Sequence, residues 1–158
     1  HQRRNLEALK HYHRSLQLAP DHVKAHGNMG GILHSHGRVK EALAHYQKAL
    51  QLEPDSVEAQ NNLAWLLATC HDASIRDGQL AVTLAERAAA TTQYKDVSVL
   101  DTLSAAYAEI GDFEKAVQWQ EVAVGMAPEP LEGELRKRLA LYRSGKSFRD
   151  EPLNTANP

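Results

Sequence analysis

A regularly repeated pattern of side chains constrains this chain more than any other feature of its sequence. The stretch from Glu7 to Pro20 recurs from Glu41 to Pro54, an interval of about 34 residues, with nearly the same order of small, aromatic and aliphatic side chains. The pattern recurs once more from Gly111 to Pro128, at a distance longer than two such intervals, so one copy contains six additional residues. A unit this small cannot bury an apolar face by itself, and the pattern therefore predicts stacked copies.

The composition indicates that each copy is helical. Alanine and leucine together number 43, against 12 for valine and isoleucine, and helix formers therefore dominate strand formers. The single cysteine, Cys70, excludes an intramolecular disulfide. We expect helices at residues 3–18, 23–36, 39–52, 57–70, 78–91, 97–110, 113–126 and 131–144.

The positions of the small residues have a physical reason. Gly30, Ala64 and Ser104 occupy equivalent places in the first helix of each pair, where small side chains let helices approach closely. Gly37 and Gly111 suit the left-handed turn that often ends a helix. With its period of about 34 residues, the pattern resembles the tetratricopeptide repeat family over most of the chain, up to about residue 145. The resemblance implies an all-α solenoid of helix-turn-helix units, wound as a right-handed superhelix with a concave groove and a C-terminal capping helix.

The period divides the chain into units, and we expect them at these residues: the second helix of a truncated repeat at 1–22, repeats at 23–56, 57–96 (with a six-residue insertion) and 97–130, a capping helix at 131–145 and a tail at 146–158. In the insertion we expect Asp72 and Arg76 to order the loop. The chain does not begin with Met, and we expect a fragment of a longer protein. The unpaired first helix leaves Leu6, Leu9, Tyr12 and Leu16 partly uncovered, which predicts upstream repeats or a homo-oligomer formed through this helix.

The concave groove of such a solenoid is lined by the first helix of each pair. The residues expected there are Lys24, Asn28, Gly31, His34, Ser35, Glu58, Asn61, Asn62, Trp65, Thr69, Asp101, Thr102, Ala105 and Glu109. Asn28 and Asn62 are separated by one period, and an amide can hydrogen-bond the backbone of an extended peptide. This pair is similar to the asparagine ladder in the repeat region of O-GlcNAc transferases, although Thr102 interrupts it. Both asparagines could instead simply face water.

Trp65 has two interpretations that the sequence leaves open. An aromatic side chain in a groove is typical of a binding hot spot. The same side chain could instead pack on the following first helix near Leu103 or Ala106 as part of the core.

Patterns that carry chemistry are weak in this sequence. His22 and His26 have the spacing of a zinc pair, but no thiolate or carboxylate follows at ligand spacing. Cys70 is interpreted as a small core residue, and neither a phosphate-binding glycine loop nor a nucleophile elbow occurs. We therefore expect no metal, no cofactor and no catalytic activity in this chain.

The charge pattern bears on the partner. The net charge is −2, with −7 in residues 57–130 between mildly basic ends. A continuous phosphate-binding surface is therefore not expected, and neither is nucleic acid as a partner. Glu58, Asp101 and Glu109 favour a neutral or basic peptide. We expect a non-catalytic scaffold that binds an extended peptide or partner helix. The alternative is a substrate-recognition arm of a larger enzyme such as an O-GlcNAc-transferase-like glycosyltransferase. The sequence contains no stretch that would insert into a membrane. It does not identify a cellular compartment, although a soluble, cytoplasmic protein is weakly favoured.

Overall fold

The expected helices are all present in the computed structural model, which describes residues 2–150 and the side chains from residue 7 onward. Within residues 2–150 the eight helices are α1 (Gln2–Leu18), α2 (Val23–Ser35), α3 (Val39–Leu52), α4 (Val57–Thr69), α5 (Gly78–Thr91), α6 (Val97–Glu109), α7 (Phe113–Met126) and α8 (Glu129–Arg143). The bounds lie within two residues of those expected from the sequence. The periodic pattern therefore identified the helices correctly.

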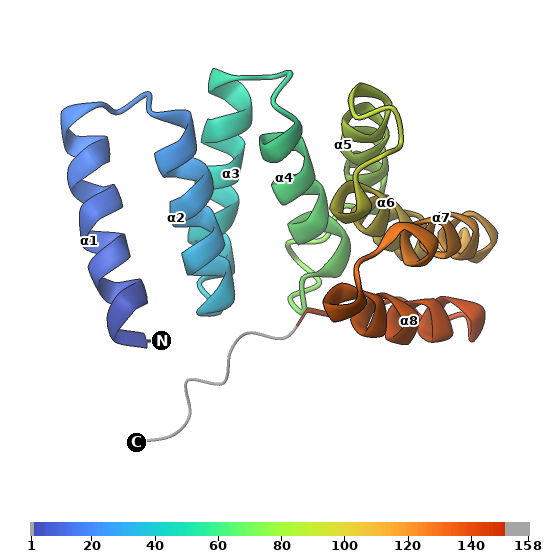
Figure 1. Ribbon diagram of the computed structural model, residues 1–158. Helices are drawn as coiled ribbons and strands as arrows, with labels where there is room; N and C mark the ends of the chain where they lie inside the picture. Colours follow the sequence, from blue (N-terminus) through green and yellow to red (C-terminus); the bar gives the residue numbers. More distant parts are fainter. Residues whose placement is uncertain (1, 151–158) are drawn as a thin grey trace.

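The helices stack as consecutive pairs along one curved array. The closest neighbours are α2 with α3, α4 with α5, and α6 with α7, while α8 packs on α7 at the end. Figure 1 shows α1 to α4 running side by side, whereas α7 and α8 run across their direction because each pair is rotated relative to the previous one. This arrangement is the all-α repeat solenoid that the sequence predicted.

Local signals explain where the helices begin and end. The carboxylate of Asp96 accepts hydrogen bonds from the backbone N–H groups of Ser98 and Val99 and so caps the start of α6. Gly37 and Gly111 have φ values of 74° and 83° in the turns that follow α2 and α6. A side chain is strained in that conformation, so the predicted role of these two glycines is confirmed.

The insertion after α4 is held by polar contacts. Asp72 accepts hydrogen bonds from the backbone N–H and the hydroxyl of Ser74. The Arg76 guanidinium binds the carbonyl of Cys70 and the Glu109 carboxylate on α6, the latter at 2.9 Å. Both residues order the loop as expected, and Arg76 also ties it to the neighbouring repeat.

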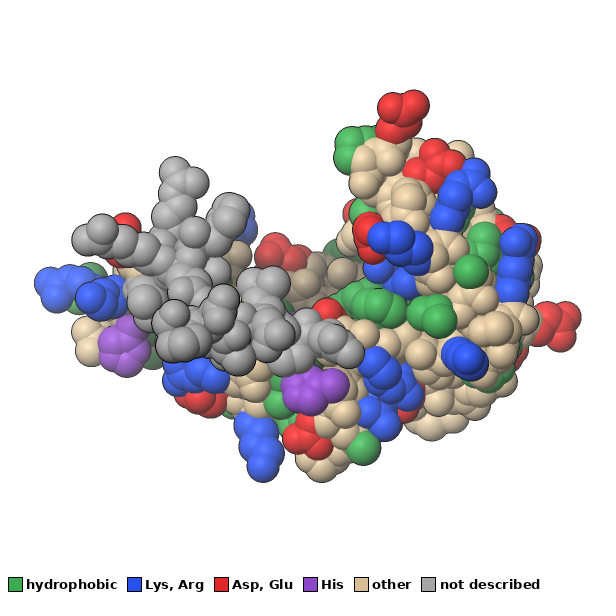
Figure 2. Space-filling view, turned by 90° about the horizontal axis from the view of Figure 1, so that it is seen from below, with side chains coloured by type: hydrophobic (Ala, Val, Ile, Leu, Met, Phe, Trp, Pro, Cys, Tyr) green, Lys and Arg blue, Asp and Glu red, His purple; other side chains and the backbone are tan. Residues whose placement is uncertain are grey.

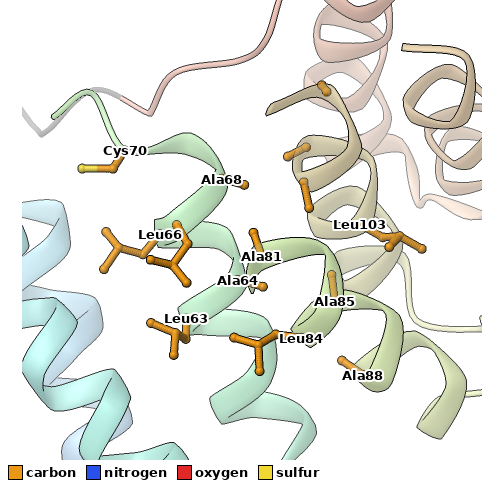
Figure 3. Packing of buried hydrophobic residues seen from close by; sticks show 14 of the residues in the cluster. Leu63, Ala64, Leu66, Ala68, Cys70, Ala81, Leu84, Ala85, Ala88 and Leu103 are labelled. Atoms are coloured by element: carbon orange, nitrogen blue, oxygen red, sulfur yellow. The ribbon is translucent and has the colours of Figure 1, made fainter. Parts of the chain in front are cut away.

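Alanines form much of the interface between neighbouring helices. Ala64 and Ala68 of α4 and Ala81, Ala85 and Ala88 of α5 are all at most 1% exposed. Figure 3 shows Ala64 and Ala81 close together where α4 and α5 meet, with Leu84 nearby, whereas Leu63 and Leu66 extend from the other side of α4. Small side chains allow the backbones to approach, and the leucines fill larger spaces in the core.

Among the described helices, α1 packs mainly on α2. Leu9, Tyr12 and Leu16 are half-buried, and Leu18 is 79% exposed. The side chain of Leu6 lies outside the described residues. Assembly through this helix stays a prediction.

The close approach of α2 and α3 depends on Gly30. A Cβ atom at this position would lie 2.6 Å from Cε1 of the buried Tyr46 ring. By contrast, a Cβ atom at Gly133 of α8 would have no neighbour within 4 Å among the described residues. The two glycines are therefore a matched pair, one required by packing and one exposed.

We expect Gly30→Ala to lower the free energy of unfolding by about 1 to 3 kcal/mol, because the Tyr46 ring must move within a packed core. Gly133→Ala should raise it by about 0.5 to 1 kcal/mol, since alanine is the better helix former. Urea denaturation followed by circular dichroism measures both. Stabilisation by Gly30→Ala would show that the contact with Tyr46 does not limit the approach of the helices.

Two histidines connect α2 and α3. Nδ1 of His26 lies 2.9 Å from Nδ1 of His45, and Nε2 of His26 lies 3.0 Å from the carbonyl of Pro20. Because that carbonyl can only accept, the neutral His26 carries its proton on Nε2 and accepts from His45 through Nδ1. Burial, and next the neighbouring His26, lower the pKa of His45.

We expect the lowered pKa of His45 to make the protein less stable as the pH falls. A histidine whose pKa is lowered by folding favours the neutral form, so its contribution is complete above about pH 6.5 and is lost as the pH falls through the lowered value. The His45→Asn variant should show a shallower loss of unfolding free energy between pH 7 and pH 5. Identical pH dependence of the two proteins in urea melts would contradict this assignment.

Candidate functional site

The predicted groove residues lie on α2, α4 and α6, and only part of this inner face is open. Lys24, Asn28 and Glu58 are exposed, and Asn61 and Asn62 are half-buried. Lys24, Glu58 and Asn62 line one hollow between the first turns of α2 and α4. Asn62 also borders a second hollow of about 210 Å³, which Asn61 lines as well. The structure therefore brings these residues together, with Asn28 one turn after Lys24 on the same side of α2.

Other predicted groove residues are buried and bonded within the chain. Thr69 is 0% exposed and donates its hydroxyl hydrogen to the carbonyl of Trp65. Thr102 is 2% exposed and donates to the carbonyl of Ser98. Ala105 is also buried. Thr69 and Ala105 belong to the packing between helices, whereas Thr102 borders the second hollow. Both threonine hydroxyls bond the preceding turn of their own helix, as threonine on a helix readily does.

Asp101 is also buried, and its carboxylate joins three helices. It accepts hydrogen bonds from Nε2 of Gln120 on α7 at 2.8 Å and from Nε of Arg138 on α8 at 2.9 Å. A second guanidinium nitrogen of Arg138 lies 2.8 Å from the other carboxylate oxygen. Burial raises the pKa of Asp101 in spite of this pairing. The expected groove acid is thus a structural anchor for the capping helix.

Glu109 is likewise paired within the chain. Its two carboxylate oxygens bind Arg76 at 2.9 Å and Arg149 at 2.7 Å. Together with the Asp101 pair, this leaves Glu58 as the only one of the three expected groove acids without an ion pair among the described residues. The expectation of a neutral or basic partner rested on all three acids, and its preference for a basic partner loses most of its support.

Part of the expected tail covers the far end of the inner face. Residues Lys146–Asp150, which we call the strap, return from α8 to the end of α4 (Figure 1). Nε1 of Trp65 donates to the Asp150 carboxylate at 3.0 Å, and the Trp65 and Phe148 rings lie 5.8 Å apart. The Arg138 guanidinium lies over both rings. Trp65 is thus half-buried and in contact with the chain's own end; residues 151–158 of the expected tail lie outside the described residues.

His34 is near the strap as well. Its Nε2 lies 3.7 Å from the Asp150 carboxylate. Burial lowers the pKa of His34, and the nearby Asp150 opposes this shift. Its neighbours on α2 are an exposed Gly31 and a half-buried Ser35, whose hydroxyl bonds the carbonyl of Ile32.

The histidines that suggested a metal pair have other contacts. Nδ1 of His22 accepts from the backbone of Ala25 as the N-cap of α2, and His26 pairs with His45. Residues 2–150 include no group of three or more potential metal ligands. Cys70 is buried, and burial raises the pKa of its thiol. Apolar surroundings of this kind keep a thiol protonated and unreactive.

Four residues that matter at this face were not among those expected from the sequence: Gln120, Arg138, Phe148 and Asp150. Gln120 lies on α7 and Arg138 on α8, and neither is the first helix of a pair. The period of the sequence indicates which helices line the groove, but not which side chains of neighbouring helices extend into it. The strap offered one signal, an aromatic residue beside an arginine after Gly145, in a stretch otherwise typical of a tail.

The described surface carries both charges. Seen from below, acidic and basic side chains alternate over the part of this face that is not grey (Figure 2). In the part of the chain that the structure describes, none of the helices is long and apolar enough to cross a membrane.

We expect Arg138→Met to lower the free energy of unfolding by about 3 to 5 kcal/mol, because it leaves the buried Asp101 carboxylate without its ion pair. The double variant Asp101→Asn/Arg138→Met should recover part of this loss, since it also removes the buried charge. Urea denaturation of both variants tests the coupling. A double variant less stable than Arg138→Met would argue against charge burial as the cause.

Comparison with known proteins agrees with this architecture. Family models match two segments, described as "TPR repeat" at residues 30–68 and "Tetratricopeptide repeat" at residues 97–130. Two solved structures of MamA are similar in fold at 21% sequence identity. The first has a TM-score of 0.61, and the match covers 87% of this chain and 78% of the MamA chain. The second has a TM-score of 0.62, and the match covers 87% of this chain and 83% of the MamA chain. No curated protein matches significantly in sequence. This chain therefore contains tetratricopeptide repeats at residues 30–68 and 97–130, arranged in an all-α solenoid of the kind seen in the MamA structures.

Proposed function

We propose that this chain is a non-catalytic interaction scaffold that binds an extended peptide on the open part of its inner face. Tetratricopeptide repeats and the MamA-like fold support the general role of binding other proteins. The observation that carries the more specific proposal is the pair Asn28 and Asn62. These residues occupy equivalent places in successive first helices, and both have accessible side chains.

The chemistry of the open part suits a peptide backbone. An asparagine amide offers donors and an acceptor, so two of them at equivalent positions can bond peptide groups a few residues apart in an extended chain. Asn62 borders both hollows of the inner face, which gives neighbouring peptide side chains two places to lie. Lys24 and Glu58 line one hollow with opposite charges, so we propose no strong charge preference for the ligand.

The length of the open surface limits the ligand. It extends from Lys24 on α2 to the second hollow, where Arg138 and the buried Asp101 form the far wall. Successive peptide residues span about 3.3 Å in an extended chain. Because the open surface ends at this wall, we propose a short extended segment as the ligand.

Screening the purified chain against a peptide array would identify a ligand, whose affinity is then measured by calorimetry. We expect Asn28→Ala/Asn62→Ala to weaken that binding by about 1 to 3 kcal/mol, which corresponds to two lost hydrogen bonds. The matched control is Gln47→Ala/Gln118→Ala, which removes two exposed amides from second helices and should leave affinity unchanged. Equal affinity of both variants would place the site elsewhere.

A further inference from the structure

The strap is held at the ends of two first helices. The last carbonyl groups of a helix have no partner within it. Here the Ser147 hydroxyl donates to the carbonyl of Ala108 at 2.8 Å, and the Asp150 N–H donates to the carbonyl of Thr69 at 2.9 Å. Asp150 also forms a parallel bridge with Cys70. The end of α4 thus accepts the backbone of an extended segment whatever its sequence, and the end of α6 accepts a serine hydroxyl.

Side chains around the strap make contacts that do depend on its sequence. The Phe148 ring packs against Trp65 and under the Arg138 guanidinium, which is 5.3 Å from its centre. The adjoining guanidinium of Arg149 pairs with Glu109 at 2.7 Å. Nε1 of Trp65, at 3.0 Å, and His34, at 3.7 Å, face the Asp150 carboxylate. The three successive residues of the strap therefore have different surroundings: Phe148 contacts an aromatic ring, Arg149 an acid, and Asp150 hydrogen-bond donors.

The receiving side chains have partners of their own. Arg76 binds Glu109 from the insertion, and Arg138 is fixed by Asp101. Asp101 and Arg138 side chains are only 11% and 12% exposed, whereas Arg149 and Asp150 are each 36% exposed. The surface under the strap is therefore built without it, and the strap joins α8 through Gly145, whose φ is 70°.

We propose that this surface is a selective binding site for an extended peptide with the order aromatic, arginine, aspartate, and that the strap occupies it in cis. The site lies at the far ends of α2, α4 and α6. It contains neither Asn28 nor Asn62, so an experiment can overturn the proposed function without overturning this proposal, and the reverse is also true. A segment attached nearby has an effective concentration of about millimolar, and a free peptide binds measurably only when the strap is released.

The test uses the full chain with Phe148→Ala/Arg149→Ala/Asp150→Ala, which we call the released variant, and the synthetic peptide Lys-Ser-Phe-Arg-Asp. Calorimetry should show at least tenfold tighter binding to the released variant than to the wild-type chain. The charge-swapped peptide Lys-Ser-Phe-Glu-Lys should bind the released variant at least tenfold more weakly. Equal binding of the two peptides, or no gain on release, overturns the proposal.

Two further variants separate the site from general unfolding. Lys146 is exposed, and Lys146→Ala should bind the peptide as the wild type does. In the released variant, Trp65→Phe should reduce the preference for aspartate over asparagine at the last peptide position, because the Nε1 donor is lost and only His34 still faces this position. An unchanged preference overturns the role of Trp65.

The remaining outcomes concern folding and the occupant. If circular dichroism shows that the released variant is unfolded, the single variant Asp150→Lys replaces it. Asp150→Lys should bind the peptide severalfold more tightly than the wild type does. An unchanged affinity overturns the proposal. Sedimentation should show the same mass for the wild type and the released variant at each concentration. A dimer that disappears in the released variant overturns it as well, because the occupant would then be the strap of a second copy.

Discussion

The approach of helix backbones at small residues is the constraint on which the rest of this structure depends. At Gly30 the ring of Tyr46 occupies the volume that a Cβ atom would need, and at the interface of α4 with α5 five alanines exclude water almost completely. Once these distances are fixed, the rotation from one pair to the next follows, and so does the concave inner face. The positions of the candidate site residues on α2 and α4 are a consequence of this packing.

The downstream end of the solenoid is fixed in a different way. There the buried Asp101 carboxylate holds Arg138 and Gln120, so α6, α7 and α8 meet at a polar cluster instead of an alanine interface. A buried ion pair adds little net stability, yet breaking it costs several kcal/mol because one charge remains buried. This geometry gives α8 one defined position, which in turn directs the strap towards the ends of α6 and α4.

The sequence allowed the helices to be predicted closely because each depends on local signals that recur in every repeat. The inner face was predicted less well. Helical phase correctly put Asn28, Asn62 and Glu58 at accessible positions, but it also selected Thr69 and Thr102, whose burial depends on how near the next pair lies. Periodicity carries no information about contacts that break the period. Arg138, Phe148 and Asp150 make such contacts, which arise from the non-repeating end of the chain.

The same contacts divide the inner face into two regions with different chemistry. Around Asn28 and Asn62 the polar groups are accessible, and a backbone can be bound with little regard to sequence. Around Trp65 and Glu109 the groups are aimed at particular side chains and already paired, so a ligand there must replace an equivalent set of contacts. Replacement favours sequences close to the strap itself, since leaving the Trp65 Nε1 donor or the Glu109 carboxylate unpaired costs free energy. The selectivity that we propose for this end therefore follows from the strap, because a competing peptide has to reproduce the contacts of the strap.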